Sequence, residues 1–220
     1  MKISLITAIA AFACASLAQL YPTKLTILET AAFRLSDGNV RSELRITEQQ
    51  KTQILEIISQ HSNKQLQISQ ELAKAKPDRY PVLQTQLEAA ELVSRRKLLD
   101  VLSAPQAARL REIAIQDEGA YILRDPSVAK QVGITSAQAA KIKVIIDRTT
   151  AALDDLSAKM GEQLEAAAKS GSDARQAAIV KSFQPKLDAI EAKGKADILN
   201  LLSTPQRAVW KKVNGAPFKN

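Results

Sequence analysis

Mostly apolar residues recur in alternating steps of four and three in two long stretches of the chain. The first series is Ile54, Ile58, His61, Gln65, Ile68 and Leu72, and the second is Ile142, Ile146, Thr149, Leu153, Leu156 and Met160. This spacing places side chains along one stripe of a helix, as at a contact between two helices. It predicts long helices over about 48–76 and 136–170. The first should stop before Pro77, because proline disfavours helical geometry in the residue that precedes it.

Each long helix is followed by the pattern of a returning helix, over about 82–101 and 173–201. Pro185 should kink or restart the second of these, because it removes a backbone donor. Short helices are expected over 104–115 and 204–213, and from Asp125-Pro126 to near Gly133. No alternating strand pattern of useful length is present. The predicted fold is all-α, with two tandem long helical hairpins that are joined by short helices and related by a pseudo-twofold axis.

The sequence also indicates an internal duplication. A motif of Ile or Leu, then a hydroxyl residue, with glutamine three positions after the hydroxyl residue, occurs four times, beginning at Ile46, Leu102, Ile134 and Leu202. The first and third copies are offset by 88 residues and the second and fourth by 100, so the second repeat contains 12 extra residues. We therefore divide the chain into a signal at 1–18, a first hairpin repeat at 19–116 and a second at 117–220.

The repeated motif has the residue types and spacing of a capping box. The hydroxyl accepts a hydrogen bond from the backbone three residues on, and the glutamine side chain reaches back to the backbone of the cap residue. This structural role accounts for the motif more simply than direct ligand binding does. The predicted helix starts are Thr47 with Gln50, Ser103 with Gln106, Thr135 with Gln138, and Ser203 with Gln206.

The first residues resemble an export signal. Lys2 precedes an apolar stretch over 3–13, and small residues up to Ala18 offer a cleavage site. The apolar stretch is too short to span a bilayer as a helix, and no later segment approaches the required length. We expect an exported, periplasmic protein without a transmembrane segment. The alternative is a lipoprotein that begins at an acylated Cys14.

The net charge of +8 favours acidic partners. Outside the cytoplasm these are acidic polypeptide, lipid headgroup or wall polymer rather than nucleic acid. Nucleic-acid binding is disfavoured further because the few aromatic residues are scattered and form no stacking platform. The densest basic cluster is Arg95-Arg96-Lys97 in the returning helix of the first repeat. It is either a solvated helix face near a helix C-terminus or the basic rim of a surface that binds client polypeptides.

Candidate chemistry is sparse. His61 is the only histidine, and the equivalent position in the second repeat is Thr149, so a polar position at the helix contact is favoured over a metal ligand. After removal of a signal that contains Cys14, no cysteine remains, and transition metals lack their preferred soft ligands. No glycine-rich phosphate loop and no nucleophile–base spacing is present. We expect no enzyme activity, no metal site and no cofactor.

The fourfold motif before amphipathic helices resembles the Leu-Thr-x-x-Gln pattern of the Spy/CpxP-like exported bacterial proteins. This resemblance implies long helical hairpins, a curved dimer, a periplasmic location and work as an ATP-independent chaperone or envelope-stress regulator. Here the pattern is Ile-Thr-x-x-Gln or Leu-Ser-x-x-Gln, and the duplication lets one chain supply both halves. The expected form is a monomeric pseudo-dimer or a homodimer. The expected partners are unfolded or envelope polypeptides. The alternatives are a structural adaptor of the envelope and, less favoured, a metal-binding stress sensor.

Overall fold

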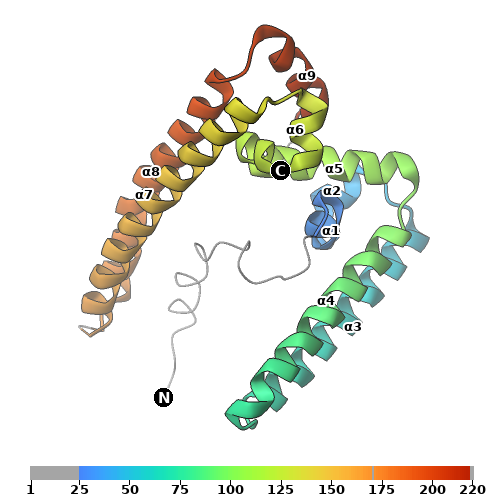
Figure 1. The fold of residues 1–220 in the computed structure, drawn as a ribbon. Helices are drawn as coiled ribbons and strands as arrows, with labels where there is room; N and C mark the ends of the chain where they lie inside the picture. Colours follow the sequence, from blue (N-terminus) through green and yellow to red (C-terminus); the bar gives the residue numbers. More distant parts are fainter. Residues whose placement is uncertain (1–24, 170, 219–220) are drawn as a thin grey trace. The chain divides into compact units, whose positions relative to one another are not determined.

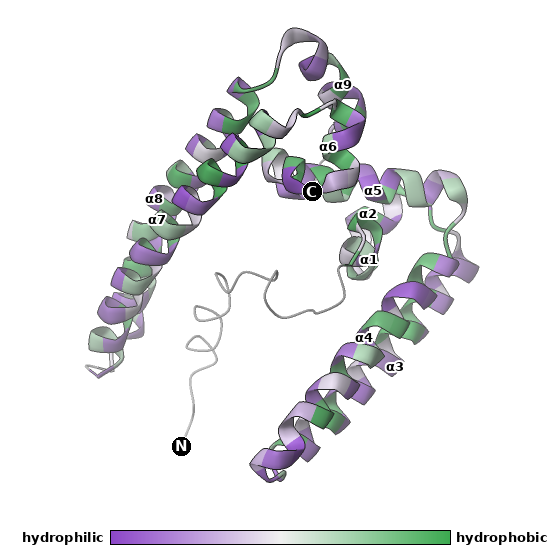
Figure 2. Ribbon diagram, viewed as in Figure 1, coloured by the Kyte–Doolittle hydropathy of each residue, from purple (hydrophilic) through white to green (hydrophobic). Residues whose placement is uncertain are grey.

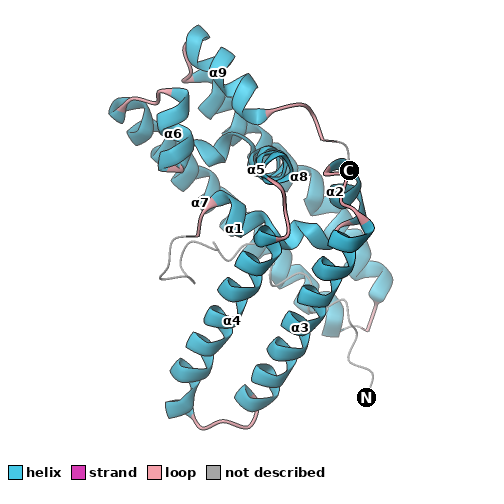
Figure 3. Cartoon of the chain, turned by 90° about the vertical axis from the view of Figure 1, so that its right-hand side faces the viewer, coloured by secondary structure: helices cyan, strands magenta, loops and turns pink. Residues whose placement is uncertain are grey.

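The regular elements of the protein are all helical in the part that the structure covers. The computed structural model describes residues 25–169 and 171–218, so the predicted signal and Cys14 lie outside the described residues. Within the described ranges the chain contains helices and loops and no strand (Figure 3), and none of these helices combines the length and apolar character needed to cross a bilayer. The chain divides into two compact units. The first unit contains the described residues up to Glu118 together with the segment from Asn214 onward, and the second covers Gly119–Val213.

The first unit is a long hairpin with short elements at its base. The long helices α3 (Glu48–Leu72) and α4 (Tyr80–Asp100) pack side by side and are joined through the 3₁₀ turn η4 (Pro77–Arg79) (Figure 1). At the base lie α1 (Ile27–Ala31), the 3₁₀ turn η3 (Ala32–Ser36) and α2 (Gly38–Glu43), followed after the hairpin by α5 (Ala104–Glu118). The predicted helix 48–76 ends four residues early, because residues 73–76 form the connection to Pro77.

The core of the first unit lies at the base of its hairpin. One buried cluster joins residues of α1, η3 and the end of α2 to the first part of α3, the end of α4 and the middle of α5. Its members are Ala31, Ala32, Leu35, Val40, Leu44, Ile54, Leu98, Leu110, Ile113 and Ala114. Toward the other end of the hairpin, α3 and α4 bury only Ile68 and Leu83. The outer part of the hairpin is therefore a two-helix layer with a narrow apolar contact, and apolar and polar residues alternate along it (Figure 2).

The second unit repeats this plan. The 3₁₀ turn η5 (Gly119–Arg124) and α6 (Pro126–Val132) lead into the hairpin of α7 (Ser136–Lys169) and α8 (Asp173–Asn200), and α9 (Thr204–Asn214) follows. The restart predicted at Pro185 does not occur, since α8 runs through it without interruption. Pro185 is exposed, as is Lys181 one turn earlier. Water can therefore satisfy the carbonyl group that loses its intrahelical partner.

The predicted helix stripe matches the burial of both hairpins in most positions. Ile54 and its equivalent Ile142 are both buried, and Ile58 and Ile146 are both half-buried. Thr149 is buried where His61 is half-buried. Gln65, which the stripe includes, is exposed, so the apolar contact of the first hairpin is interrupted there. The two hairpins thus keep the same phase, as an internal duplication requires.

The C-terminal segment packs with the first unit, although the sequence predicts that all of 117–220 belongs to the second repeat. From Asn214 onward the chain belongs with the first unit. The Gln116 side chain donates hydrogen bonds to the carbonyl oxygens of Asn214 and Ala216, at 2.5 and 2.8 Å, and accepts one from the backbone N–H of Phe218 at 2.8 Å. Phe218 also packs against the buried cluster of the first unit. One glutamine therefore fixes the segment to α5.

The turns before the two long helices have the same left-handed geometry. Arg45 and Gly133 are equivalent at the offset of 88, and both have positive φ, of 51° and 77°. In each turn the following isoleucine donates its backbone N–H to a carbonyl of the preceding short helix, Ile46 to Arg41 and Ile134 to Ala129. This is a Schellman type of helix end, where glycine is the preferred residue.

We expect opposite effects from exchanging residue types at these two turns. Arg45→Gly should raise the free energy of unfolding by about 0.5–1 kcal/mol, because it relieves a left-handed side-chain conformation. Gly133→Ala should lower it by about 1 kcal/mol. No atom lies within 4 Å of the Cβ that Gly133→Ala would add, so backbone strain alone should decide the result. Urea unfolding followed by circular dichroism measures both, and a loss of stability in Arg45→Gly would contradict the argument.

Candidate functional site

The four copies of the repeated motif lie at the four helix starts that form the bases of the hairpins. The glutamine side-chain oxygen accepts a hydrogen bond from the backbone N–H of the hydroxyl residue in every copy, at 2.9–3.1 Å. At Thr47, Thr135 and Ser203 the hydroxyl oxygen accepts from the glutamine backbone N–H in return. At Ser103 the hydroxyl instead donates to the Gln106 oxygen, at 3.0 Å.

The glutamines of one repeat also bind each other, which we call the glutamine clasp. In the first repeat the amide nitrogen of Gln50 donates to the Gln106 oxygen at 2.8 Å, and that of Gln106 donates to the Gln50 oxygen at 3.1 Å. The same nitrogens also bond to backbone carbonyls, Gln50 to Val101 at 2.8 Å and Gln106 to Leu44 at 3.2 Å. The clasp therefore ties the start of α3 to the start of α5.

The second repeat contains the same clasp. Gln138 and Gln206 exchange hydrogen bonds of 2.8 and 2.9 Å, and their amide nitrogens also bind the carbonyls of Leu201 and Gly133. Leu201 is the equivalent of Val101, and Gly133 is the equivalent of Arg45, which Gln106 approaches at 3.4 Å. A capping box alone uses only part of the glutamine hydrogen-bonding capacity. The remaining part closes the base of each hairpin, so the motif residues are engaged within the fold.

A polar and aromatic cluster lies between the first hairpin and η3. The ring of Phe33 contacts the ring of His61, with centroids 4.7 Å apart, and the Arg95 guanidinium lies 4.9 Å from the Phe33 centroid. Arg95 also binds Glu91 and donates to the carbonyl oxygens of Glu29 and Thr30 at 2.6 and 2.9 Å. These contacts dock the end of α1 and the start of η3 onto α4.

The second repeat has a matching cluster with altered residues. Tyr121 takes the place of Phe33, Thr149 that of His61, and Lys195 that of Arg95. The Lys195 ammonium lies 5.6 Å from the Tyr121 ring centroid and pairs with Glu191 at 3.3 Å. The Tyr121 hydroxyl donates to the backbone carbonyl of Glu191 at 3.0 Å. Burial raises the pKa of Tyr121, although a hydrogen bond with Thr149 opposes that shift.

His61 should make the first repeat sensitive to acid. Its Nδ1 atom is buried without a hydrogen-bond partner, and burial lowers the pKa of His61, with nearby Arg95 lowering it further and Glu91 opposing. The unfolded chain therefore takes up the proton first. The stabilising contribution should be complete above the unfolded pKa, about 6.5, and should decline as the pH falls below it toward the folded pKa.

The measurement is thermal unfolding followed by circular dichroism between about pH 7.5 and pH 5. His61→Thr, which installs the residue of the second repeat, should flatten this part of the profile. The chain has one histidine, so no other imidazole contributes to the slope. An equally steep profile in the variant would show that the acid sensitivity has another origin.

The structure separates the three members of the predicted basic cluster. Arg95 has a side chain that is only 12% exposed, and its guanidinium is occupied by the contacts described above. Arg96 is 62% exposed and pairs with Glu29 at 3.1 Å. Lys97 is exposed and faces a groove between α3 and α4. Of the three side chains, only those of Arg96 and Lys97 are exposed enough to belong to the basic rim that the sequence predicted as one alternative.

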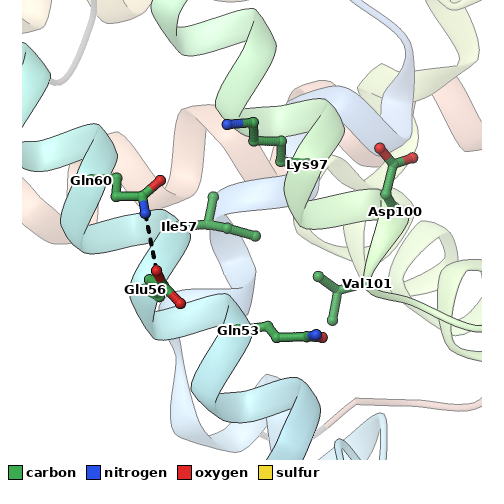
Figure 4. Close-up of a pocket in the computed structure, with 7 residues that line it drawn as sticks. All are labelled: Gln53, Glu56, Ile57, Gln60, Lys97, Asp100 and Val101. Atoms are coloured by element: carbon green, nitrogen blue, oxygen red, sulfur yellow. Dashed lines mark hydrogen bonds between the residues drawn. The ribbon is translucent and has the colours of Figure 1, made fainter.

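The groove beside Lys97 is the candidate binding site of the first hairpin. It is a shallow, open depression of about 400 Å³ at the base of the hairpin, and Figure 4 shows the side chains that line it. Its apolar floor is formed by Ile57 of α3 and by Val101, which directly follows α4, and polar side chains surround it (Figure 4). The surrounding residues are Gln53, Glu56, Gln60, Lys97 and Asp100. This groove could not be predicted from the sequence, because its residues come from two helices and share no motif.

Within the described residues, no group of three or more His, Cys, Asp or Glu side chains is arranged to hold a metal ion. Comparisons with family models, with curated proteins and with solved structures give no match to the chain.

Proposed function

We propose that this protein is an exported, ATP-independent binding protein that holds partly unfolded polypeptides on the open surfaces of its helical hairpins. The proposal combines the resemblance of its fourfold motif to the Spy/CpxP-like proteins with the surface of the hairpins. In this view the glutamine clasps keep the hairpin bases closed. The outer helix faces are left to bind clients.

Exposed apolar side chains on the two-helix hairpins are the main structural support for client binding. In the first hairpin, Leu55 and Leu66 lie eleven residues apart on α3, and Val82 and Val93 lie eleven residues apart on α4. Eleven residues are close to three helical turns, so each pair shares one helix face. Leu66 is 58% exposed and Val93 is 52% exposed. Unfolded polypeptides expose apolar side chains that such faces can cover.

The second hairpin presents fewer such positions. Val144 of α7 is 65% exposed and Val180 of α8 is 39% exposed. The positions equivalent to Leu55 and Val93 are Lys143 and Lys193, each of which pairs with an aspartate on its own helix. The first hairpin therefore has the greater apolar exposure, and we expect it to contribute most of the client contact.

The net charge should assist the capture of acidic clients. A charge of +8 attracts them over long distances, and salt screens this attraction over about 10 Å at 0.1 M ionic strength. Apolar contacts then act at short range and are much less sensitive to salt. We therefore expect protection of acidic clients to weaken as salt rises, with a smaller change for neutral clients.

The test is light scattering of a chemically unfolded client that is diluted into buffer without ATP. The purified protein should slow aggregation at stoichiometric ratios, and Val82→Ser with Val93→Ser should reduce this protection. A basic, inert protein of similar size controls for charge. Protection no better than that of the control across several clients would exclude the chaperone function and favour the structural adaptor.

A further inference from the structure

The groove at the base of the first hairpin is bordered by exposed polar side chains, several of which form no polar contact within the described part of the protein. The side chains of Gln53, Lys97 and Asp100 make no hydrogen bond or ion pair with other described residues, although all three border the groove. Gln60 binds Glu56 through its amide nitrogen at 3.1 Å, which leaves its oxygen toward the groove edge (Figure 4). An amide, an ammonium and a carboxylate together offer both donors and acceptors above an apolar floor.

At the equivalent place in the second hairpin, an ion pair connects the two helices. The counterparts of Gln60 and Lys97 are Arg148 and Asp197, and these form an ion pair of 2.6 Å from α7 to α8. Lys193 also approaches Asp197 at 3.2 Å. These contacts lower the pKa of Asp197. The same position is thus bridged by an internal ion pair in one repeat and left open with unused polar groups in the other.

We propose that the open groove of the first hairpin binds an extended segment of an unfolded polypeptide through its main chain. This inference rests on the proposed function and names the place where a client binds. An extended segment presents backbone carbonyls, which Lys97 and the Gln53 amide can meet as donors. It also presents backbone N–H groups, which Asp100 and the Gln60 oxygen can meet as acceptors.

The surroundings of the groove fit an extended chain better than a small molecule. Val93 lies one helical turn before Lys97 on the same face of α4, and Val82 lies three turns before Val93. On α3, the spacing of Ile57, Gln60 and Lys64 keeps these residues on one stripe. A segment that leaves the groove can therefore continue along apolar and polar positions of the hairpin. Main-chain recognition explains how one site can accept clients of different sequence.

The decisive variant transfers the ion pair of the second repeat into the first. Gln60→Arg with Lys97→Asp should bridge the groove, as Arg148 and Asp197 do in their own hairpin. Both positions are exposed, so the fold should tolerate the change. A control with the same net charge is Gln70→Arg with Lys74→Asp, at exposed positions near the opposite end of α3. A second test variant, Gln53→Ala with Asp100→Ala, removes polar groups without introducing a pair.

The readout is fluorescence anisotropy of a labelled, uncharged peptide of alternating Val and Ser residues with capped termini, added to the full chain. The bridged variant should bind it about tenfold more weakly than the natural protein, and the control should bind it unchanged. Gln53→Ala with Asp100→Ala should also weaken binding. Unchanged affinity in the bridged variant, or an equal loss in the control, would overturn the inference. If the natural protein slows aggregation but does not bind the peptide, the groove assignment fails alone. If it does neither, the proposed function fails.

Discussion

Gly194→Ala should destabilise the second repeat by about 1–3 kcal/mol, although the same change in an open helix stabilises. Gly194 is buried in α8 against Tyr121 and Thr149. A Cβ at this position would overlap the Tyr121 hydroxyl and approach the Thr149 hydroxyl oxygen to 2.6 Å. Relief requires displacement of the tyrosine, whose hydroxyl bonds to the carbonyl of Glu191. Overpacking of this kind outweighs the gain in helix propensity.

The matched control is Gly161→Ala in α7 of the same hairpin. Nothing lies within 4 Å of the Cβ that this change would add. Alanine is the better helix former, so this variant should gain about 0.5–1 kcal/mol. Urea unfolding followed by the fluorescence of Trp210, the single tryptophan, reports on the second repeat in both cases. Equal shifts of the same sign would mean that the contact around Gly194 does not limit side-chain size.

Loss of the glutamine clasp should have an effect of similar size. Gln206→Ala removes the donor to the Gly133 carbonyl and the partner of Gln138, together with the acceptor for the Ser203 backbone N–H. Half-buried polar groups are left without partners, so the free energy of unfolding should fall by about 1–3 kcal/mol. Gln138→Ala should behave alike. The double variant should cost less than the sum of the two, because one shared contact is lost in both.

The control for the clasp is Gln184→Ala in α8. This glutamine makes one exposed hydrogen bond, to Asp188 at 2.8 Å. Its removal should change the stability by no more than about 0.5 kcal/mol. The measurement again uses Trp210, which lies one helical turn after Gln206 in α9. Additive losses from Gln138→Ala and Gln206→Ala would contradict a clasp that works as a unit.

The long hairpins could be predicted from sequence because the steps of four and three extend over many turns. The repeat of that phase at the offset of 88 made the prediction stronger than one stretch allows. The short elements α1, η3 and α2 were missed because five or six residues contain too little periodicity. A local signal did exist for α1, since Thr26 and Glu29 form a capping box with the same spacing as the repeated motif.

The parts of the site that sequence reasoning missed depend on contacts between distant residues. The capping role of Gln50 follows from its spacing to Thr47, but its bond to Gln106 joins residues 56 positions apart. The aromatic cluster likewise joins Phe33 to Arg95. Arg95, Arg96 and Lys97 form one basic cluster in the sequence, but adjacent positions point in different directions on a helix, so the three side chains have different surroundings. Arg95 is largely buried because α1 packs against α4, a contact between residues more than 60 positions apart.

The most direct test of client binding on the first hairpin is photo-cross-linking from single positions of α4. A benzophenone side chain at position 93 faces the proposed binding surface, whereas one at position 84 lies two and a half turns away and points to the opposite face. Both positions are exposed. An unfolded client should be cross-linked efficiently from position 93 and weakly from position 84. Equal cross-linking from both positions, or none from position 93 while aggregation is still suppressed, would contradict the account.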